Sequence, residues 1–129
     1  MTPRNRRGDR ATRIDPFDID WAVTDPRGKE VVMLKSVERA RELMGKHASP
    51  PEFLSTDDVK TVVEDPDRID ESVSHTDRDI YYRVEGEEEY PYSRAVVDYC
   101  DNADRGIVVS WSRYETPVSS YGVIWSKGS

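Results

Sequence analysis

One stretch joins the helical half of this chain to its sheet half: GKHASPPEFLSTDDVKTVVEDPDRIDESVSHTDRDIYYR, residues 45–83. Its first part ends a helix, because two prolines follow shortly after His47 and the residue before a proline avoids helical geometry. Its middle part predicts a second, shorter helix that begins at Ser55 or Thr56 and is ended by Asp65-Pro66, with an apolar side formed by Val59, Val62 and Val63. Its last part, Ile80–Arg83, begins an alternating strand. The stretch therefore predicts helices followed by a sheet.

Upstream of this stretch, two apolar segments flank the turn sequence Asp25-Pro26-Arg27-Gly28, which has proline second and glycine fourth. The two segments, 21–24 and 30–34, predict a β-hairpin or an extended lead-in packed on the domain. A helix should then run from Ser36 to about His47, with an apolar stripe formed by Val37, Ala40, Leu43 and Met44. We therefore expect His47 at a helix C-terminus, on or near that stripe.

Downstream, alternating segments predict three or four strands over Ile80–Val84, Tyr92–Tyr99, Gly106–Tyr114 and Tyr121–Trp125. A further short strand near 68–73 stays open. This order indicates an α+β fold in which N-terminal helices pack on a three- to four-stranded antiparallel sheet, with or without a leading β-hairpin.

The alternation also predicts which side chains share a face of the sheet. We expect the helices to cover a face that carries Ile80, Tyr82, Val97, Val109 and Trp111. The other face then displays Tyr81, Arg83, Arg94, Ser110, Ser112 and Tyr114. This open face is either an ordinary solvated sheet surface or a shallow anion-binding cleft. The second interpretation follows from the affinity of arginine for phosphate and of tyrosine for unpaired bases.

Length and composition set the outer limits of the function. A chain of 129 residues is one domain by length, and we divide it into an Arg-rich flexible arm (1–18) and a single α+β domain (19–129). The lone Cys100 cannot form an intramolecular disulfide, which points either to a reducing compartment, such as the cytoplasm, or to indifference to redox conditions. One cysteine and two histidines exclude a zinc site with four Cys/His ligands. No apolar run approaches the ~20 residues of a membrane span, and no secretory signal is recognisable.

The charge balance bears on the partners that the protein can bind. The formal net charge is -7, and lysine is scarce beside arginine, a composition typical of salt-adapted (halophilic) proteins. An acidic surface disfavours nucleic acid, because phosphates prefer a basic one. Binding of nucleic acid would need a local basic cleft, or high salt that screens the acidic surface.

Loose motifs over about residues 30–125 carry a family resemblance. They are Gly45-Lys46-His47 after a helix, Pro66-Asp67-Arg68-Ile69, Tyr81-Tyr82-Arg83, Arg94-Ala95-Val96-Val97 and the strand Gly106–Ser112. Together they resemble the phage- and toxin-type nuclease domains of the barnase–EndoU–colicin–RelE group. That resemblance implies an N-terminal helical part, a four-stranded antiparallel sheet and metal-independent RNA cleavage by a toxin- or effector-like protein. Ser110 and Ser112 stand where a late-strand threonine is expected, which keeps the hydroxyl group.

The chemistry that the resemblance implies is attack of the RNA 2′-hydroxyl on the adjacent phosphate, with no metal or other cofactor. It assigns catalytic roles to His47, Arg83, Ser110 and Ser112. It assigns substrate-binding roles to Lys46, Tyr81, Arg94 and Tyr114. His47 would act as base or acid, and the second proton-transfer group is not identifiable from the sequence. The expected partners are an RNA substrate and a cognate antitoxin or immunity protein.

A second hypothesis makes the protein a non-enzymatic acidic interaction protein, such as an antitoxin, an immunity protein or a small regulator. Complementary charge speeds association with basic partners. Under this hypothesis the acidic segments 85–89 and 98–104 bind the partner, and His47 is structural. A third hypothesis is a degenerate nuclease fold that binds RNA without cutting it.

Overall fold

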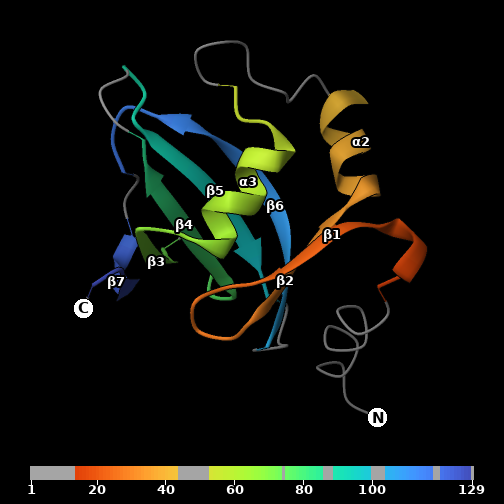
Figure 1. Cartoon of the computed structure of the whole chain (residues 1–129), viewed down its shortest axis with the longest axis horizontal. Helices are drawn as coiled ribbons and strands as arrows, with labels where there is room; N and C mark the ends of the chain where they lie inside the picture. Colours follow the sequence, from red (N-terminus) through yellow and green to blue (C-terminus); the bar gives the residue numbers. More distant parts are fainter. Residues whose placement is uncertain are drawn as a thin grey trace.

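A computed structural model of the chain describes residues 14–43, 53–73, 75–85, 89–99, 104–117 and 120–128. The fold is α+β: two α-helices and one seven-stranded mixed sheet that opens with a β-hairpin (Figure 1). The α+β class and the leading hairpin agree with the sequence-based prediction. The sheet is larger than predicted and is not purely antiparallel.

The elements follow one another as η1 (Pro16–Asp18), β1 (Ile19–Thr24), β2 (Glu30–Leu34), α2 (Lys35–Leu43), α3 (Thr56–Glu64), β3 (Arg68–Ser72), β4 (Arg78–Val84), β5 (Tyr92–Asp98), β6 (Arg105–Tyr114) and β7 (Ser120–Ser126). Across the sheet the strand order is β1-β2-β6-β5-β4-β3-β7. The short strand that stayed open near 68–73 is therefore present as β3, and the last expected strand is present as β7.

Two pairings enlarge the sheet beyond the prediction. β7 pairs with β3 rather than with β6, the strand before it in the chain. β2 pairs in parallel with β6, Glu30–Val32 against Arg105–Ile107. Shortly beyond this pairing the chain leaves β2 and enters α2. In the described residues, no strand pairs with β6 on that side beyond Ile107, so the second half of β6 has a free edge toward α2.

Helix α3 supplies the larger part of the helical cover. Of the two starting residues predicted, Ser55 is the N-cap: its hydroxyl accepts from the amide of Asp58 at 3.1 Å. Val59, Val62 and Val63 are buried, also as predicted, and the helix packs on β1, β4 and β5. Burying each of these side chains stabilises the fold by about 1.5–3 kcal/mol.

Helix α2 is anchored less deeply than the sequence suggests. None of its side chains in the described residues is fully buried, and only Val37 packs against the core. Ala40 is exposed and Leu43 is 79% exposed, so the predicted buried stripe is wrong at these two positions. The first turn is held by Asp18, whose carboxylate accepts from the Ser36 amide at 3.0 Å and from the Ser36 hydroxyl at 2.5 Å.

The helix-covered face of the sheet differs from the predicted one. Tyr81, Ala95 and Trp111 lie directly opposite one another on β4, β5 and β6, and all three belong to the core under the helices. Their neighbours Ile80 and Tyr82 must therefore point to the opposite side. The prediction that the helices cover Ile80 and Tyr82 is wrong, whereas Trp111 lies on the helix side as predicted.

A bulge in β6 shifts the face of one more residue. Val96 pairs with Ser110, but Val97 pairs with Val108, so Val109 is an extra residue in this strand. Val97 and Val108 are in the core. The prediction is correct for Val97 and wrong for Val109, whose place is taken by Val108.

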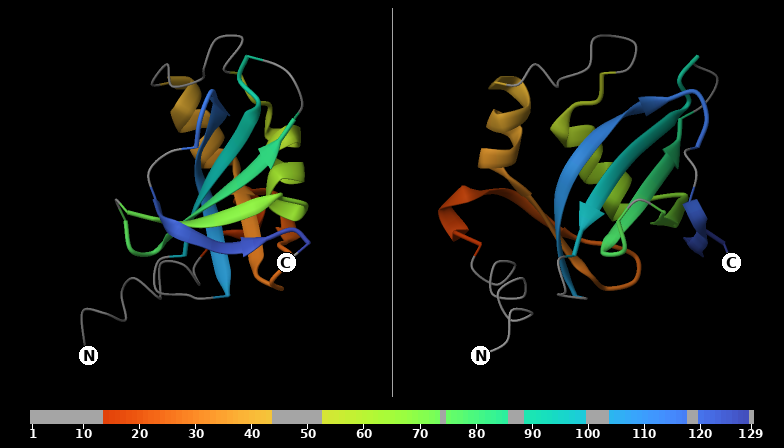
Figure 2. Two further views of the ribbon diagram at one scale, coloured as in Figure 1. Left: turned by 90° about the vertical axis from the view of Figure 1, so that its left-hand side faces the viewer. Right: turned by 180° about the vertical axis from the view of Figure 1, so that it is seen from behind.

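The sheet surface opposite the helices is here called the rear face (Figure 2). On β4, β5 and β6 it comprises Ile80, Tyr82, Tyr92, Arg94, Val96, Ser110, Ser112 and Tyr114. Ile80 and Tyr82 are buried, whereas the others are partly exposed. Within the described part of the chain, neither α-helix covers this surface.

Candidate functional site

Four of the eight predicted site residues gather on the rear face. Arg94 lies opposite Ser112 on the neighbouring strand, with Tyr114 and Ser110 one pair to either side on the same face. All four are partly exposed. The structure thus brings together one guanidinium group, two aliphatic hydroxyls and one phenol, as expected for the open face.

Arg94 is held in place without being neutralised. Its guanidinium carbon lies 3.8 Å from the centre of the Tyr114 ring, and its Nη2 donates to the Tyr114 hydroxyl at 2.5 Å. Its Nε is buried and has no hydrogen-bond partner in the described residues, and no described carboxylate pairs with it. Cation–π stacking fixes the position of a guanidinium but leaves its net charge uncompensated. Arg94 can therefore attract an anion.

The remaining aromatic side chains of the rear face are packed more tightly. The rings of Tyr82 and Tyr92 meet edge to face, with centroids 6.3 Å apart. Arg68 lies over the Tyr82 ring at 5.0 Å, and both its Nε and Nη2 donate to the carboxylate of Asp70, at 2.8 and 2.9 Å. The pair with Asp70 neutralises Arg68, so among the described residues of the rear face Arg94 carries the uncompensated charge.

Tyr81 is not on the rear face, contrary to the prediction. It is buried under the helices, where its hydroxyl donates to Asp25 at 2.7 Å, accepts from Arg27 at 3.0 Å and bonds the hydroxyl of Tyr99. Burial, followed by the neighbouring Tyr99, raises the pKa of Tyr81. Tyr81 thus fastens the β1–β2 turn to the sheet and is not accessible for stacking on a base.

Arg83 also lies on the helix-covered side, because it shares a face with Tyr81. Its Nη1 donates to the backbone carbonyl of Asp65 at 2.7 Å and to the Asp65 carboxylate at 3.0 Å, and its Nε lies 3.6 Å from Glu85. The prediction that Arg83 shares an open face with Arg94 and the two serines is wrong. Its charge is matched by two carboxylates.

Lys46 and His47 lie outside the described residues, within 44–52. Their predicted orientation toward the sheet is therefore untested. The nearest described residues on either side are Leu43 and Phe53, and Phe53 lines a hollow between the two helices. The other histidine, His75, is exposed in the β3–β4 connection.

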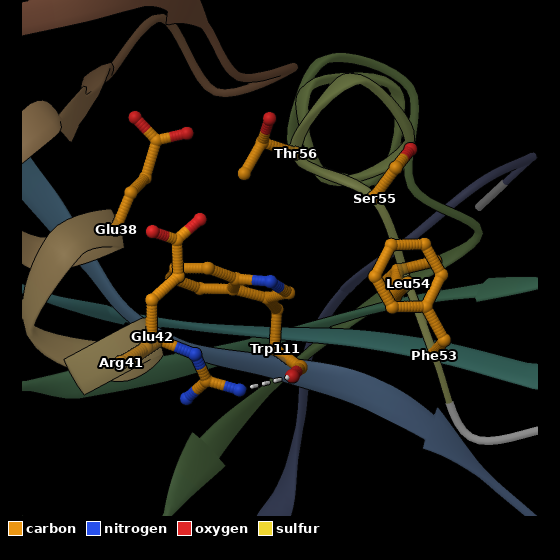
Figure 3. Close-up of a pocket in the computed structure, with 8 residues that line it drawn as sticks. All are labelled: Glu38, Arg41, Glu42, Phe53, Leu54, Ser55, Thr56 and Trp111. Carbon is orange, nitrogen blue, oxygen red and sulfur yellow. Dashed lines mark hydrogen bonds between the residues drawn. The ribbon is translucent and has the colours of Figure 1, made fainter. Parts of the chain in front are cut away.

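This hollow was not predicted from the sequence. It has a volume of about 270 Å³ and is lined by Glu38, Arg41, Glu42, Phe53, Leu54, Ser55, Thr56 and Trp111 (Figure 3). Arg41 lies 4.1 Å from the centre of the Trp111 ring, and its Nη2 donates to the Trp111 carbonyl at 2.9 Å. In the sequence, no feature distinguishes Glu38 and Arg41 from the other charged residues of their helix, so the hollow could not be recognised there.

The hollow contains a carboxyl group with an unusual acidity. Burial, together with a hydrogen bond and charge from Asp20, raises the pKa of Glu38 to about 7. The hydroxyl of Thr56 acts in the opposite direction, and the charge of Glu42 adds to the rise. Glu38 can therefore exchange a proton near neutral pH.

The hollow and the rear face meet at the free edge of β6. The bond from Arg41 to the Trp111 carbonyl occupies a backbone acceptor of this edge. Ser110 and Ser112 flank Trp111 in the chain and point to the other side of the strand. Burial lowers the pKa of Arg41 from its ordinary value.

Known proteins supply no assignment for this site. No family model, no curated protein and no solved structure matches the chain. Over the described residues, no group of three or more His, Cys, Asp or Glu side chains is arranged to hold a metal ion. Neither described α-helix has the length and apolarity of a membrane span. The resemblance to the nuclease group stays a prediction, and the function must be argued from the geometry.

Proposed function

We propose that the protein is a metal-independent endoribonuclease, toxin- or effector-like, that holds single-stranded RNA on the rear face and at the adjoining edge of β6. The observation that supports this proposal is the uncompensated guanidinium of Arg94 between Tyr114 and Ser112. In an acidic chain, such a charge concentrates anions locally despite the net repulsion.

The binding chemistry follows from the groups at hand. Arg94 offers guanidinium donors to a phosphate, and the hydroxyls of Ser112 and Ser110 add neutral donors beside it. Within the described part of the chain, the Ser112 hydroxyl makes one long bond, 3.4 Å to the Arg113 carbonyl, so it can turn toward a ligand. Tyr114 is partly exposed and presents a phenol on which an unpaired base can stack.

The proposed reaction needs a proton acceptor, a proton donor and a cation. The 2′-hydroxyl oxygen forms a bond to phosphorus, the bond to the 5′-oxygen breaks, and a 2′,3′-cyclic phosphate and a 5′-hydroxyl result. One group takes the 2′-hydroxyl proton and another supplies a proton to the leaving oxygen. We assign His47 to one of these transfers because an imidazole titrates near neutrality. Arg94 would stabilise the charge that develops on the phosphoryl oxygens.

The test is cleavage of a single-stranded RNA in excess chelator by the wild type, His47→Ala, Arg94→Gln and Arg105→Gln. Losing a general acid–base group should lower kcat by about 10²–10⁴-fold. Losing the charged phosphate contact of Arg94 should lower kcat/KM by about 10- to 100-fold, since a hydrogen bond to a charged group contributes about 1.5–3 kcal/mol.

Arg105→Gln is the matched control, because it removes the same charge from β6 at a residue paired with Glu30 at 2.7 Å. It should cleave like the wild type. Equal losses of kcat/KM in Arg94→Gln and Arg105→Gln would show that the loss comes from the lower net charge and not from a phosphate contact of Arg94. Cleavage unaffected by His47→Ala would remove the histidine from the mechanism.

A second candidate function rests on the net charge of -7. A non-enzymatic acidic interaction protein would show no cleavage at low or molar salt by any variant. It would instead bind a basic protein, with an association rate that falls as salt rises.

A further inference from the structure

Four residues of the rear face form one row that crosses four neighbouring strands. Arg68 of β3 lies opposite Tyr82 of β4, and Tyr82 lies opposite Arg94 of β5. Arg94 in turn lies opposite Ser112 of β6. Neighbouring strands are about 4.8 Å apart, so the backbones of the two arginines are separated by about 10 Å. This arginine row, Arg68–Tyr82–Arg94–Ser112, runs across the strands and not along them (Figure 2).

An aromatic row runs beside the arginine row on the same face. It consists of Tyr92 of β5 and Tyr114 of β6, which lie directly opposite each other. Both rings are partly exposed. Each tyrosine is two residues along its strand from a member of the arginine row, a separation of about 6.7 Å. The rear face thus places a line of guanidinium groups beside a line of accessible rings.

Arg68 is fixed in the arginine row by two neighbours. Its guanidinium carbon lies 5.0 Å from the centre of the buried Tyr82 ring, and its Nε and Nη2 donate to the Asp70 carboxylate. Asp70 is itself buried and accepts from the Ser120 hydroxyl at 3.0 Å. The pair with Asp70 engages two of the five guanidinium N–H groups, and 35% of the Arg68 side chain is exposed. Arg68 can therefore donate to a ligand while its charge stays matched.

The two rows match the two sides of an unpaired nucleic acid strand. Phosphates follow one another along one side of such a strand, and guanidinium groups bind them through paired N–H donors. Bases follow along the other side, and tyrosine rings stack on bases of any identity. In a duplex the bases are stacked and paired with each other, so their faces cannot reach a protein ring.

We propose that RNA crosses the strands of the rear face between β6 and β3, with one phosphate at Arg94, a second phosphate at Arg68 and bases over Tyr114 and Tyr92. This inference rests on the proposed function and names the class of its substrate: an unpaired strand with at least two phosphates, bound with little regard to base sequence. Asp70 is a positioning residue, because it holds Arg68 over Tyr82.

The two arginines contribute to binding in different ways. Arg94 has no described carboxylate partner and attracts phosphate by its net charge. Arg68 is paired with Asp70, so it contributes hydrogen bonds without adding net charge. Loss of Arg94 should therefore lower both the affinity for RNA and its salt dependence, because fewer counterions are released. Loss of the Arg68–Asp70 pair should lower the affinity and leave the salt dependence unchanged.

The experiment measures binding of cleavage-resistant, 2′-O-methylated RNA by fluorescence anisotropy in excess chelator. A labelled hexanucleotide reports on both phosphate contacts, and a competing dinucleotide with a single phosphate reports on Arg94. The variant is Arg68→Gln/Asp70→Asn, which removes the ion pair and keeps the net charge. Its Kd for the hexanucleotide should rise about 3- to 10-fold, whereas its Kd for the dinucleotide should stay that of the wild type. Tyr92→Leu should raise the Kd for the hexanucleotide at least about fivefold.

The matched control is Arg78→Gln/Asp98→Asn. Arg78 and Asp98 form an equivalent ion pair, 3.2 Å long, on the same face of β4 and β5 but outside both rows. This variant should bind both RNAs like the wild type, and thermal unfolding of each variant checks that the fold is intact.

Three results would overturn the proposed path, and they differ in what they say of the ribonuclease. Wild-type affinity for the hexanucleotide in Arg68→Gln/Asp70→Asn and Tyr92→Leu, with weaker binding in Arg94→Gln, would remove the path and leave RNA at Arg94. Equal losses in the two ion-pair variants would remove the specific contact of Arg68. No binding of either RNA by the wild type would remove the proposed function together with the path.

Discussion

At the scale of single residues, the charged side chains divide into those that hold the fold and those left open to a ligand. Asp25 is of the first kind: its carboxylate accepts from the amides of Arg27 and Lys29 and from the Tyr81 hydroxyl. Arg94 is of the second kind, because its charge rests on a tyrosine ring without a described carboxylate. In the sequence both are ordinary charged residues, and nothing shows which of them is paired in the fold.

Tyr81→Phe tests the structural role of the first kind. The change removes one donor to the buried Asp25 carboxylate and keeps the ring, so it should lower the free energy of unfolding by about 1–3 kcal/mol. Urea denaturation measures the effect. Tyr121→Phe is the matched control, since Tyr121 is 70% exposed and should tolerate the change without loss. Equal stability of Tyr81→Phe and the wild type would contradict the role of this hydroxyl.

At the scale of elements, the sequence predicted the helices and strands well and their faces less well. The start of α3 at Ser55 or Thr56, the buried valines of α3 and the turn at Asp25–Gly28 each have a local cause, and all three predictions are confirmed. No local feature determines which face of β4 the helices cover, because Ile80, Tyr81 and Tyr82 are all buried. A strand buried on both sides shows no contrast between its faces, so alternation alone could not tell which side the helices cover.

Long-range pairings explain the remaining differences. The parallel pairing of β2 with β6 joins segments about 75 residues apart, and neither segment carries a local mark of it. The bulge at Val109 changes the parity within β6, which no pattern of period two can express. For the same reason the hollow at Glu38 and Trp111 could not be predicted: its walls come from two helices and a strand that approach only in the fold.

Gly106→Ala tests the close approach of β5 to β6 near the start of β6. A Cβ atom at Gly106 would lie 2.4 Å from Val97 Cγ1 and 2.8 Å from Tyr99 Cε1. Since both neighbours are in the core, the variant should lose about 1–3 kcal/mol of stability through overpacking. Thermal unfolding checks this expectation against Val84→Ala, a change at a position that is 51% exposed. A melting temperature of Gly106→Ala equal to that of the wild type would show that the side chains of Val97 and Tyr99 can make room without cost.

At the scale of the whole molecule, RNA binding depends more on where the charges lie than on the net charge. A chain of net charge -7 repels RNA at long range, yet most arginines of the described sheet are paired with carboxylates. Pairing confines the uncompensated charge on the rear face to the vicinity of Arg94. Any RNA contact should therefore be local, and it should weaken further when salt screens the few phosphate contacts.

The most direct measurement of the central claim is a nuclear magnetic resonance titration of the isotope-labelled protein with a short, cleavage-resistant single-stranded RNA. We predict shifts of the backbone amides of β5 and β6 around Arg94 and Ser112, which weaken as salt rises and disappear in Arg94→Gln. Shifts confined to the acidic segments, or no shifts at any RNA concentration, would contradict the proposal that the rear face binds RNA.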